Sequence, residues 1–368
     1  MKLRGNRLLR GADASLGRLL VFFLGLIRLR RSFPKIESIG VLRLSAIGDL
    51  ILLSGVIQDL RHQHPQAKII LFCGRDNCLV APLIPGVDQV ECLDLSSPLR
   101  CIRALRHHRL SLLLDFAQWS RIDALFSYFS GARYTVGFRT PGQQRHSLYN
   151  LTIDHSPDCH EIDNFRHLAQ LSGSMTLPVL QLKAEPLPVD IRAFCSQPLI
   201  LLHPWAAGRN AEERQWPKER WVALAHQLIE AGYRVAVTGG PADLACSQAL
   251  IEAIGPCDEL KSFAGRLSLN QLGHVIQAAS AVVSVNTGTM HFAACFSTPL
   301  VGLSGPTSDK RWGPLGTHAL SLSSTCAGCP YLHLGWEQPQ NPPACMEGIS
   351  VDQVLDALAS KIVLYNSR

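Results

Sequence analysis

The sequence predicts an α/β protein made of two doubly wound parallel sheets, and three observations support this prediction. The chain has 368 residues, about two to three times the length of a typical single domain. Its composition, 47% hydrophobic and 17% charged, indicates sizeable buried cores and excludes a disordered chain. In each half, short apolar strands alternate with glycine-containing loops and helices, as in a parallel sheet covered on both faces.

The first half begins this alternation at residues 38–44, a β-branched and apolar run that we predict to be a strand. The loop 45–49, Ser-Ala-Ile-Gly-Asp, follows it. Apolar residues then recur at helical spacing, at Leu50, Leu53, Ile57 and Leu60. Residues 67–72 and 110–115 are further strand candidates, so we expect a first domain over residues 36–185.

The second half follows a proline-rich stretch, residues 186–198, which we interpret as a linker. A helix is predicted over residues 221–231, where Gly232 ends it. The predicted strands of this half are residues 199–203, 233–237, 281–285 and 299–303. We therefore expect a second domain over residues 186–368, and a ligand-binding cleft between the carboxyl ends of the two sheets.

The positive charge of the chain is concentrated at its N-terminus. The formal charge is +6, but residues 1–35 alone contain nine Lys or Arg and a single acid, Asp13. Subtracting these from the 35 basic and 29 acidic residues of the whole chain leaves 26 and 28, a small negative charge. A body without excess positive charge does not predict a nucleic-acid partner.

Within residues 1–35, a basic and apolar tail, an uncharged run from Leu19 to Ile27 lies between Arg18 and Arg28. It is too short to cross a bilayer, which takes about 20 residues. The favoured interpretation is an amphipathic helix in the membrane interface, and a helix packed on the protein's own surface is the alternative. A secretory signal is disfavoured because arginines rather than small residues follow the run. We predict that residues 1–33 bind an anionic membrane surface.

Twelve cysteines are scattered along the chain, and most have no regular spacing. In a protein of this length they indicate reduced, buried thiols and a cytoplasmic location. The exception is Cys326-Ala-Gly-Cys329 with Cys345 downstream. These three residues are compatible with a metal site or a disulfide, but a single Cys-x-x-Cys favours free structural thiols.

Asp49 lies at the start of a predicted helix, directly after the first strand. A carboxylate there can accept a proton from a substrate hydroxyl. It can equally be an acid stabilised by the helix dipole, which also lowers its basicity. Position alone leaves both interpretations open.

Two loops of the second half are candidates for phosphate binding. Residues 286–289, Asn-Thr-Gly-Thr, precede a helix, where a diphosphate can bind but where an ordinary N-cap is more common. For residues 238–241, Thr-Gly-Gly-Pro, an ordinary turn after a strand is the favoured interpretation and phosphate binding the alternative. Neither loop is a complete dinucleotide fingerprint or a P-loop, which disfavours a nicotinamide enzyme and a P-loop NTPase.

Two groups of basic residues are candidates for anion binding. Arg209, Arg214 and Lys218 surround Trp216-Pro217 and could neutralise a diphosphate or simply be solvated. A second group of three arginines would lie on one face of a helix. We favour a solvated face over one that binds an anionic acceptor. This group is Arg100, Arg103 and Arg106.

Residues 42–50, Leu-Arg-Leu-Ser-Ala-Ile-Gly-Asp-Leu, resemble the opening of the heptosyltransferases, glycosyltransferase family nine. Further segments resemble the same family in order along the chain, from about residue 36 to residue 355. They are residues 201–204, 214–217, 235–241, 263–269, 283–291 and 305–314.

The resemblance implies a glycosyltransferase-B architecture, in which two Rossmann-like domains face a cleft. The first domain would bind the acceptor and the second the nucleotide-sugar donor. The reaction implied is transfer of heptose from ADP-heptose to a lipid-linked saccharide of the lipopolysaccharide core, with inversion and without a metal or other cofactor. The implied location is cytoplasmic, peripherally associated with the inner membrane.

The resemblance also implies roles for individual residues. Asp49 matches the catalytic base and Arg214 a basic residue near the donor phosphates. The predicted donor-binding residues are Gly239, Gly240, Ser268, Asn286, Thr287, Gly288, Thr289 and His291. Asn286 departs from the family, in which Asp is frequent, so the donor sugar can differ from heptose. The alternatives are a nucleotide-sugar epimerase or hydrolase and a non-catalytic sugar-nucleotide-binding scaffold at the membrane.

Overall fold

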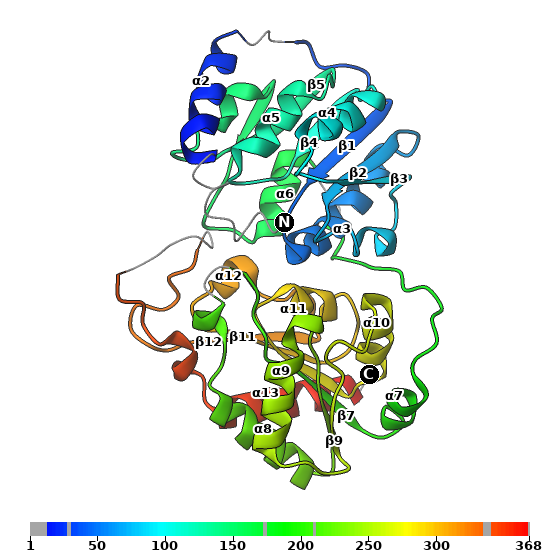
Figure 1. Ribbon diagram of the computed structural model, residues 1–368, viewed down its shortest axis with the longest axis vertical. Coiled ribbons are helices and arrows are strands. Elements are labelled where there is room, and N and C mark those ends of the chain that lie inside the picture. Colours follow the sequence, from blue (N-terminus) through cyan, green and yellow to red (C-terminus); the bar gives the residue numbers. More distant parts are fainter. Residues whose placement is uncertain (1–12, 28–30, 172–174, 209–210, 334–339, 367–368) are drawn as a thin grey trace. The chain divides into compact units, whose positions relative to one another are not determined.

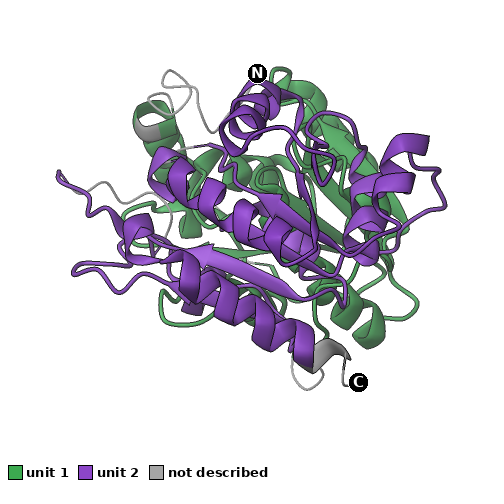
Figure 2. Ribbon diagram, turned by 90° about the horizontal axis from the view of Figure 1, so that it is seen from below, with its two compact units in different colours: residues 1–180 green, residues 181–368 purple. Residues whose placement is uncertain are grey.

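The computed structural model describes residues 13–27, 31–171, 175–208, 211–333 and 340–366. The chain divides into two units, residues 1–180 and 181–368 (Figure 2). The division falls slightly before the boundary predicted at residue 185. The reason is that the segment after Leu180 is bound to the second unit: Asn270 Nδ2 donates to Lys183 O at 2.6 Å and Gln271 Nε2 to Pro186 O at 2.7 Å.

Unit 1 contains a six-stranded parallel sheet in the order β3-β2-β1-β4-β5-β6, with buried apolar residues along its central strands (Figure 1). The strands are β1 (Ser38–Arg43), β2 (Lys68–Gly74), β3 (Gln89–Leu93), β4 (Leu112–Asp115), β5 (Tyr134–Arg139) and β6 (Leu151–Asp154). The helices are α3 (Ile47–Gln63), α4 (Pro98–His107), α5 (Arg121–Phe129) and α6 (Glu161–Ala169), with short 3-10 turns at η3 (Ala81–Leu83) and η4 (Arg145–Leu148). Helix α3 packs against α6 and α4 against α5.

The predicted apolar run of the tail forms most of helix α2 (Arg18–Leu26), which follows a π-helical turn, η2 (Asp13–Gly17). Val21 is fully buried against Ala124 and Leu148, and the Asp13 carboxylate pairs with Arg121 at 3.3 Å. Leu24 is partly buried against the same cluster. The exposed large apolar side chains of this region are Leu16, Leu19, Leu20, Phe22, Phe23, Leu26 and Ile27. One face of the helix is therefore packed on unit 1 and the other is open. Among the described residues, no helix is long and apolar enough to cross a membrane.

Unit 2 contains a second six-stranded parallel sheet, in the order β12-β11-β10-β7-β8-β9 (Figure 1). The strands are β7 (Leu199–His203), β8 (Arg234–Val237), β9 (Leu260–Ser262), β10 (Ala281–Val285), β11 (Leu300–Ser304) and β12 (Ala319–Ser323). The helices are α7 (Val189–Phe194), α8 (Lys218–Glu230), α9 (Leu244–Ile254), α10 (Leu269–Ala278), α11 (Gly288–Ala293), α12 (Asp309–Trp312) and α13 (Val351–Asn366), with turns η5 (Glu212–Arg214), η6 (Pro241–Asp243) and η7 (Cys345–Gly348). The predicted fold class, two doubly wound parallel sheets, is confirmed.

The cysteines depart from the expectation of free thiols. Cys329 is joined to Cys345 in a disulfide, and Cys78 to Cys92 in another, with Cα atoms 5.9 Å apart in each pair. Cys326 is free. The folded chain brings these pairs to bonding distance, whereas their sequence spacing does not specify a partner.

Candidate active site

Asp49 is buried in the first turn of α3, immediately beyond the carboxyl end of β1. Its Oδ2 accepts a hydrogen bond from Nη2 of Arg43, the last residue of β1, and the two form a buried ion pair. The residue that precedes the helix, Ala46, has a φ of 68°, a conformation that L-residues rarely adopt. The loop is thus held in an unusual backbone geometry beside a buried carboxylate.

A second buried charge cluster lies at the end of β4. Both oxygens of Asp115 are occupied: Oδ1 accepts from the Ala117 N–H at 2.9 Å, and Oδ2 accepts from Arg145 at 2.8 Å and Tyr149 at 2.5 Å. Burial, together with the charge of Asp115, raises the pKa of the nearby Asp123 to about 7. Because Asp115 is saturated by internal hydrogen bonds, this cluster supports the fold and offers no free base.

In unit 2, Asn286 follows β10 and is buried. Its Nδ2 donates to Trp312 O at 3.0 Å and to Ser304 Oγ at 3.2 Å. A carboxylate cannot donate either hydrogen bond, so the amide of Asn286 has a structural function at this position. The amide oxygen Oδ1 of Asn286 can accept a hydrogen bond.

Arg214 reaches the same loop from a distant part of the sequence. Its Nη1 donates to Asn286 O at 3.1 Å and its Nη2 to Ala207 O at 2.6 Å. The guanidinium is half-buried and is held at the end of β10 by two carbonyls. The structure therefore brings Arg214 and Asn286 together.

Helix α11 begins directly after this loop. Thr287 is its N-cap, and the buried Thr287 Oγ1 has no hydrogen-bond partner among the described residues. Gly288 and Thr289 form the first turn, and His291 is buried one turn later. The helix has only six residues, so its dipole is small and its contribution is the backbone N–H groups of the first turn.

The glycine turn after β8 is tightly built. Gly240 N–H donates to Asp243 Oδ2 at 2.8 Å, and Gly239 O accepts from Gly265 N–H at 2.9 Å. A Cβ on Gly239 would lie 2.9 Å from Trp205 and 2.8 Å from Asp243. The turn is thus joined to the segment 263–269 by a backbone hydrogen bond.

Ser268 has a structural function in this fold. Its hydroxyl accepts from Gln271 N–H at 3.0 Å as the N-cap of α10 and lies 2.9 Å from a carboxylate oxygen of Glu185. The prediction that Ser268 binds the donor remains a prediction.

His203, the last residue of β7, lies in the segment 201–204 but is not among the predicted site residues. Its Nδ1 lies 3.0 Å from Thr238 Oγ1, and burial lowers the pKa of His203 to about 4. The imidazole is therefore neutral at pH 7. Arg209, the neighbour predicted to bind anions, lies outside the described residues, and Lys218 is exposed.

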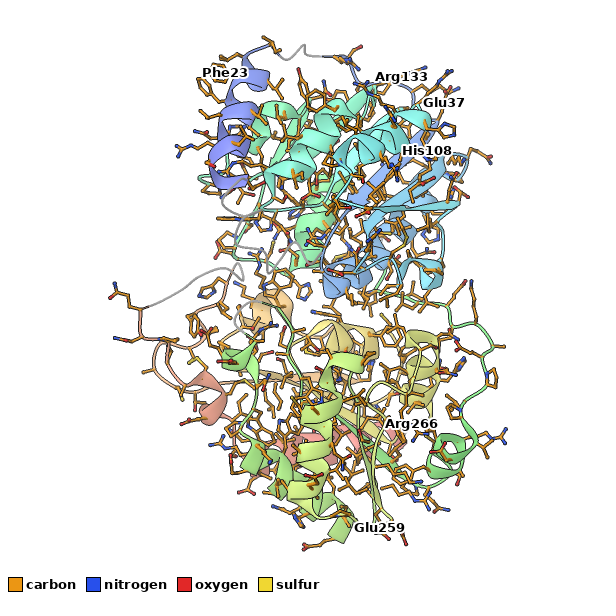
Figure 3. The ribbon with its side chains drawn as sticks, viewed as in Figure 1. Phe23, Glu37, His108, Arg133, Glu259 and Arg266 are labelled. Carbon is orange, nitrogen blue, oxygen red and sulfur yellow. A yellow bond between two sulfur atoms is a disulfide. The ribbon has the colours of Figure 1, made fainter. Side chains whose placement is uncertain are left out.

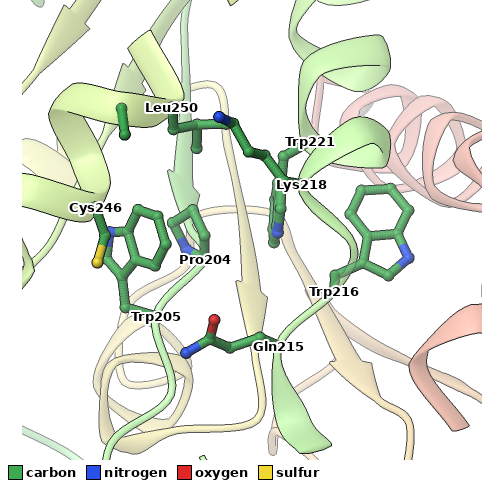
Figure 4. Close-up of a pocket in the computed structure, with 9 residues that line it drawn as sticks. Pro204, Trp205, Gln215, Trp216, Lys218, Trp221, Cys246 and Leu250 are labelled. Carbon is green, nitrogen blue, oxygen red and sulfur yellow. The ribbon is translucent and has the colours of Figure 1, made fainter. Parts of the chain in front are cut away.

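A cavity of about 290 Å³ lies beside these elements, between α8 and α9 (Figure 4). Trp205, Trp216, Trp221, Lys218 and Cys246 are among the residues that line it. None of the predicted donor-binding residues does so. Trp205 separates the cavity from the Gly239 turn, so the cavity is a neighbour of the candidate site and not the site itself.

Comparisons with known proteins decide the family. Residues 99–333 match the model of glycosyltransferase family 9 (heptosyltransferase). The chain belongs to glycosyltransferase family 9. Lipooligosaccharide heptosyltransferase 2 of Haemophilus influenzae is 36% identical over 311 residues, 75% of this chain and 85% of the relative. Lipopolysaccharide heptosyltransferase 2 of Escherichia coli is 25% identical over 302 residues, 75% and 84% respectively.

The solved structures agree on the fold. The structure of E. coli ADP-heptose lps heptosyltransferase II superimposes with a TM-score of 0.73 at 21% identity, covering 90% of this chain and 100% of that chain. The glycosyltransferase-B architecture predicted for the family 9 enzyme is therefore confirmed. The enzyme is a glycosyltransferase of the heptosyltransferase family.

Proposed function

We propose that this glycosyltransferase moves a heptose from ADP-heptose to a sugar hydroxyl of a lipid-linked lipopolysaccharide-core acceptor, with inversion and without a metal ion. The names of its relatives support the donor and acceptor classes. Unit 2 would bind the donor and unit 1 the acceptor. The observation that carries the proposal is the position of the Arg214 guanidinium against the loop that starts α11.

A departing nucleoside diphosphate needs positive charge and N–H donors. Arg214 supplies a cation held by two carbonyls, and the first turn of α11 supplies backbone N–H groups. The buried Thr287 hydroxyl adds a polar group at the same loop. These groups together can stabilise the charge for which other glycosyltransferases use a divalent cation.

The proposed reaction is a single displacement. The acceptor hydroxyl oxygen forms a bond to the anomeric carbon while the bond from that carbon to the diphosphate oxygen breaks. Asp49 takes the hydroxyl proton, and the electron pair leaves with ADP. Asn286 Oδ1 is the proposed acceptor for a donor-sugar hydroxyl, because its Nδ2 is bonded to Trp312 and Ser304.

The test is a screen of nucleotide sugars, with and without core acceptor, that measures both nucleoside diphosphate release and sugar transfer. Acceptor-dependent release from ADP-heptose, unchanged by chelator, is the expected result. Free sugar without acceptor would indicate a hydrolase, and an isomerised donor an epimerase. Nucleotide binding without turnover on any acceptor would indicate a scaffold.

We also propose that the open face of α2 binds an anionic membrane surface and places the enzyme peripherally at the inner membrane. Phe22 and Phe23 are 52% and 61% exposed on this face, and Phe23 is labelled in Figure 3. Arg18 is exposed on the same helix, which complements anionic headgroups. Because Val21 is buried against unit 1, the helix would present a fixed face to the lipid and not a free tail.

Vesicle sedimentation tests this attachment without removing the packed helix face. The double substitution Phe22→Ser and Phe23→Ser should release the protein from anionic vesicles. The matched control is Val189→Ser, since Val189 is 74% exposed in unit 2. Sedimentation of the double variant at the level of the control would mean that α2 only packs on the protein.

A further inference from the structure

We propose that Arg43 positions the carboxylate of Asp49. A chain of buried side-chain hydrogen bonds, from Arg43 through Gln118 to Glu161 and His155, holds the Arg43 guanidinium in place. The inference rests on the proposed function, in which Asp49 is the base. It concerns residues to which neither the sequence motifs nor the relatives gave a part.

The guanidinium of Arg43 has a single possible orientation. Its Nε donates to Ser45 O at 3.0 Å, and its Nη1 donates to Phe116 O at 2.6 Å and to Gln118 Oε1 at 2.8 Å. Its Nη2 donates to Asp49 Oδ2. Since the guanidinium is planar and only 2% exposed, the three fixed acceptors determine where Nη2 points. The acceptors thereby determine the position of the Asp49 carboxylate.

The backbone of Arg43 is held as well. Asn77 Nδ2 donates to Arg43 O at 3.0 Å, and Asn77 Oδ1 accepts from Gly74 N–H at 2.9 Å. Asn77 is fully buried and ties the end of β1 to the end of β2. Neither the main chain nor the side chain of Arg43 can shift without breaking buried hydrogen bonds.

A second carboxylate lies on the other side of Gln118. The Gln118 Nε2 donates to Glu161, which is fully buried, while its Oε1 accepts from Arg43, so the amide has one orientation. His155 Nε2 lies 3.1 Å from Glu161 Oε1, and Asn164 Nδ2 donates to Oε2 at 3.3 Å. Glu161 is therefore held in place at the far end of the chain.

The Arg43 guanidinium connects the two carboxylates of this chain. Here the Arg43 cation lies between two carboxylates, one bonded directly and one through an amide.

The ion pair of Arg145 with Asp115 is a matched control within the same unit. It is also a buried arginine–aspartate pair at the end of a strand, with a distance of 2.8 Å. Its Asp115 also accepts hydrogen bonds from the Tyr149 hydroxyl and from the Ala117 N–H. Arg145→Lys should lower thermal stability and leave the kcat of the folded protein within about threefold of wild type.

Steady-state kinetics of four variants test the proposal, with each kcat normalised to the fraction that binds ADP. Arg43→Gln should lower kcat about 10²-fold with the donor KM nearly unchanged, because positioning is lost but donor contacts are not. Arg43→Lys should recover part of that loss. Gln118→Leu and Glu161→Gln should each lower kcat about tenfold, although neither touches Asp49.

The outcomes separate the two proposals. Equal kcat in wild type and Arg43→Gln, or an equal fall in the Arg145→Lys control, would overturn the positioning role. A rise in donor KM that accounts for the whole effect would also overturn it. Transfer of a sugar other than heptose would refute the donor assignment and leave the kinetic comparison valid. Absence of any transfer would remove the reaction in which Asp49 acts, and this inference with it.

Discussion

In unit 1, strands β1 and β4 end in charged side chains, whereas β7 and β10, which occupy the same places in the strand order of unit 2, end in neutral ones. Strand β1 ends in Arg43 and β4 in Asp115, whereas β7 ends in His203 and Asn286 directly follows the end of β10. In doubly wound sheets these neighbouring strand ends are the place where ligands bind. The same topology therefore provides a buried carboxylate, Asp49, paired with Arg43 in unit 1, and a loop of neutral side chains contacted by Arg214 in unit 2. A base needs a held carboxylate, and a diphosphate needs N–H donors without competing negative charge.

The largest expected effect comes from removing the base of unit 1. Asp49→Asn should lower kcat about 10²- to 10⁴-fold, because the amide cannot accept the proton. ADP binding, measured by calorimetry, should be unchanged because unit 2 is intact. Transfer at the wild-type rate would exclude Asp49 as the base.

The next effect belongs to unit 2. Arg214→Gln should lower kcat about 10²- to 10³-fold and weaken ADP binding as well, because the proposed reaction uses this cation to stabilise the leaving diphosphate. Arg214→Lys, which keeps the charge, should retain part of both. If Asp49→Asn weakened ADP binding as much as Arg214→Gln, the division of labour between the units would be wrong.

The two units should also respond oppositely to acid. Burial lowers the pKa of His203 from 6.5 to about 4, so the unfolded chain binds more protons between these values. The contribution of His203 to the free energy of unfolding is therefore fully present above about pH 6.5. It is lost as the pH drops towards 4, and its size is on the order of 3 kcal/mol. Burial raises the pKa of Asp123 in unit 1 from 3.8 to about 7, so its contribution has the opposite sign: it is largest at low pH and is lost as the pH rises towards 7.

Urea denaturation at a series of pH values measures both contributions. His203→Gln should reduce the loss of stability between pH 6.5 and 4, and Asp123→Asn should remove the opposing gain. Tryptophan fluorescence reports mainly unit 2, since residues 1–180 contain only Trp119. Parallel pH profiles for wild type and His203→Gln would contradict the assignment.

The smallest expected effect concerns the glycine turn. Gly239→Ala should destabilise the protein by about 1–3 kcal/mol, because the new methyl group would meet Trp205 and Asp243. Gly240→Ala is the matched control, since its nearest neighbour would lie 3.7 Å away. Equal melting temperatures for the two variants would show that the turn adjusts to a side chain.

Much of the fold could be predicted from local pattern. The predicted strands at 199–203 and 281–285 coincide with β7 and β10. The predicted helix 221–231 ends one residue after α8 does, and α8 begins three residues earlier than predicted. Strands β6 and β12 are only partly buried, so their residues form no long apolar run and the sequence pattern does not predict them as strands. The basic residues Arg100, Arg103 and Arg106 of α4 are exposed.

The site divides in the same way. Asp49 and the loop 286–291 lie in contiguous motifs, and a motif is visible in the sequence. The chain from Arg43 through Gln118 to Glu161 joins residues up to 118 positions apart, and no local spacing connects them. Arg43 lies within the motif of residues 42–50, and this position in the motif is the sequence feature that points to it.

The sequence by itself determined the two parallel sheets, the family, the basic tail and the residues of the local motifs, because period, glycine loops and charge are properties of neighbouring residues. Only the tertiary structure decided which buried charges are paired, that Asn286 uses its amide protons on Trp312 and Ser304, that Cys329 joins Cys345, and which face of α2 is open. These outcomes depend on which distant segments meet, and burial makes an unpaired polar group costly enough that each such meeting has to be satisfied.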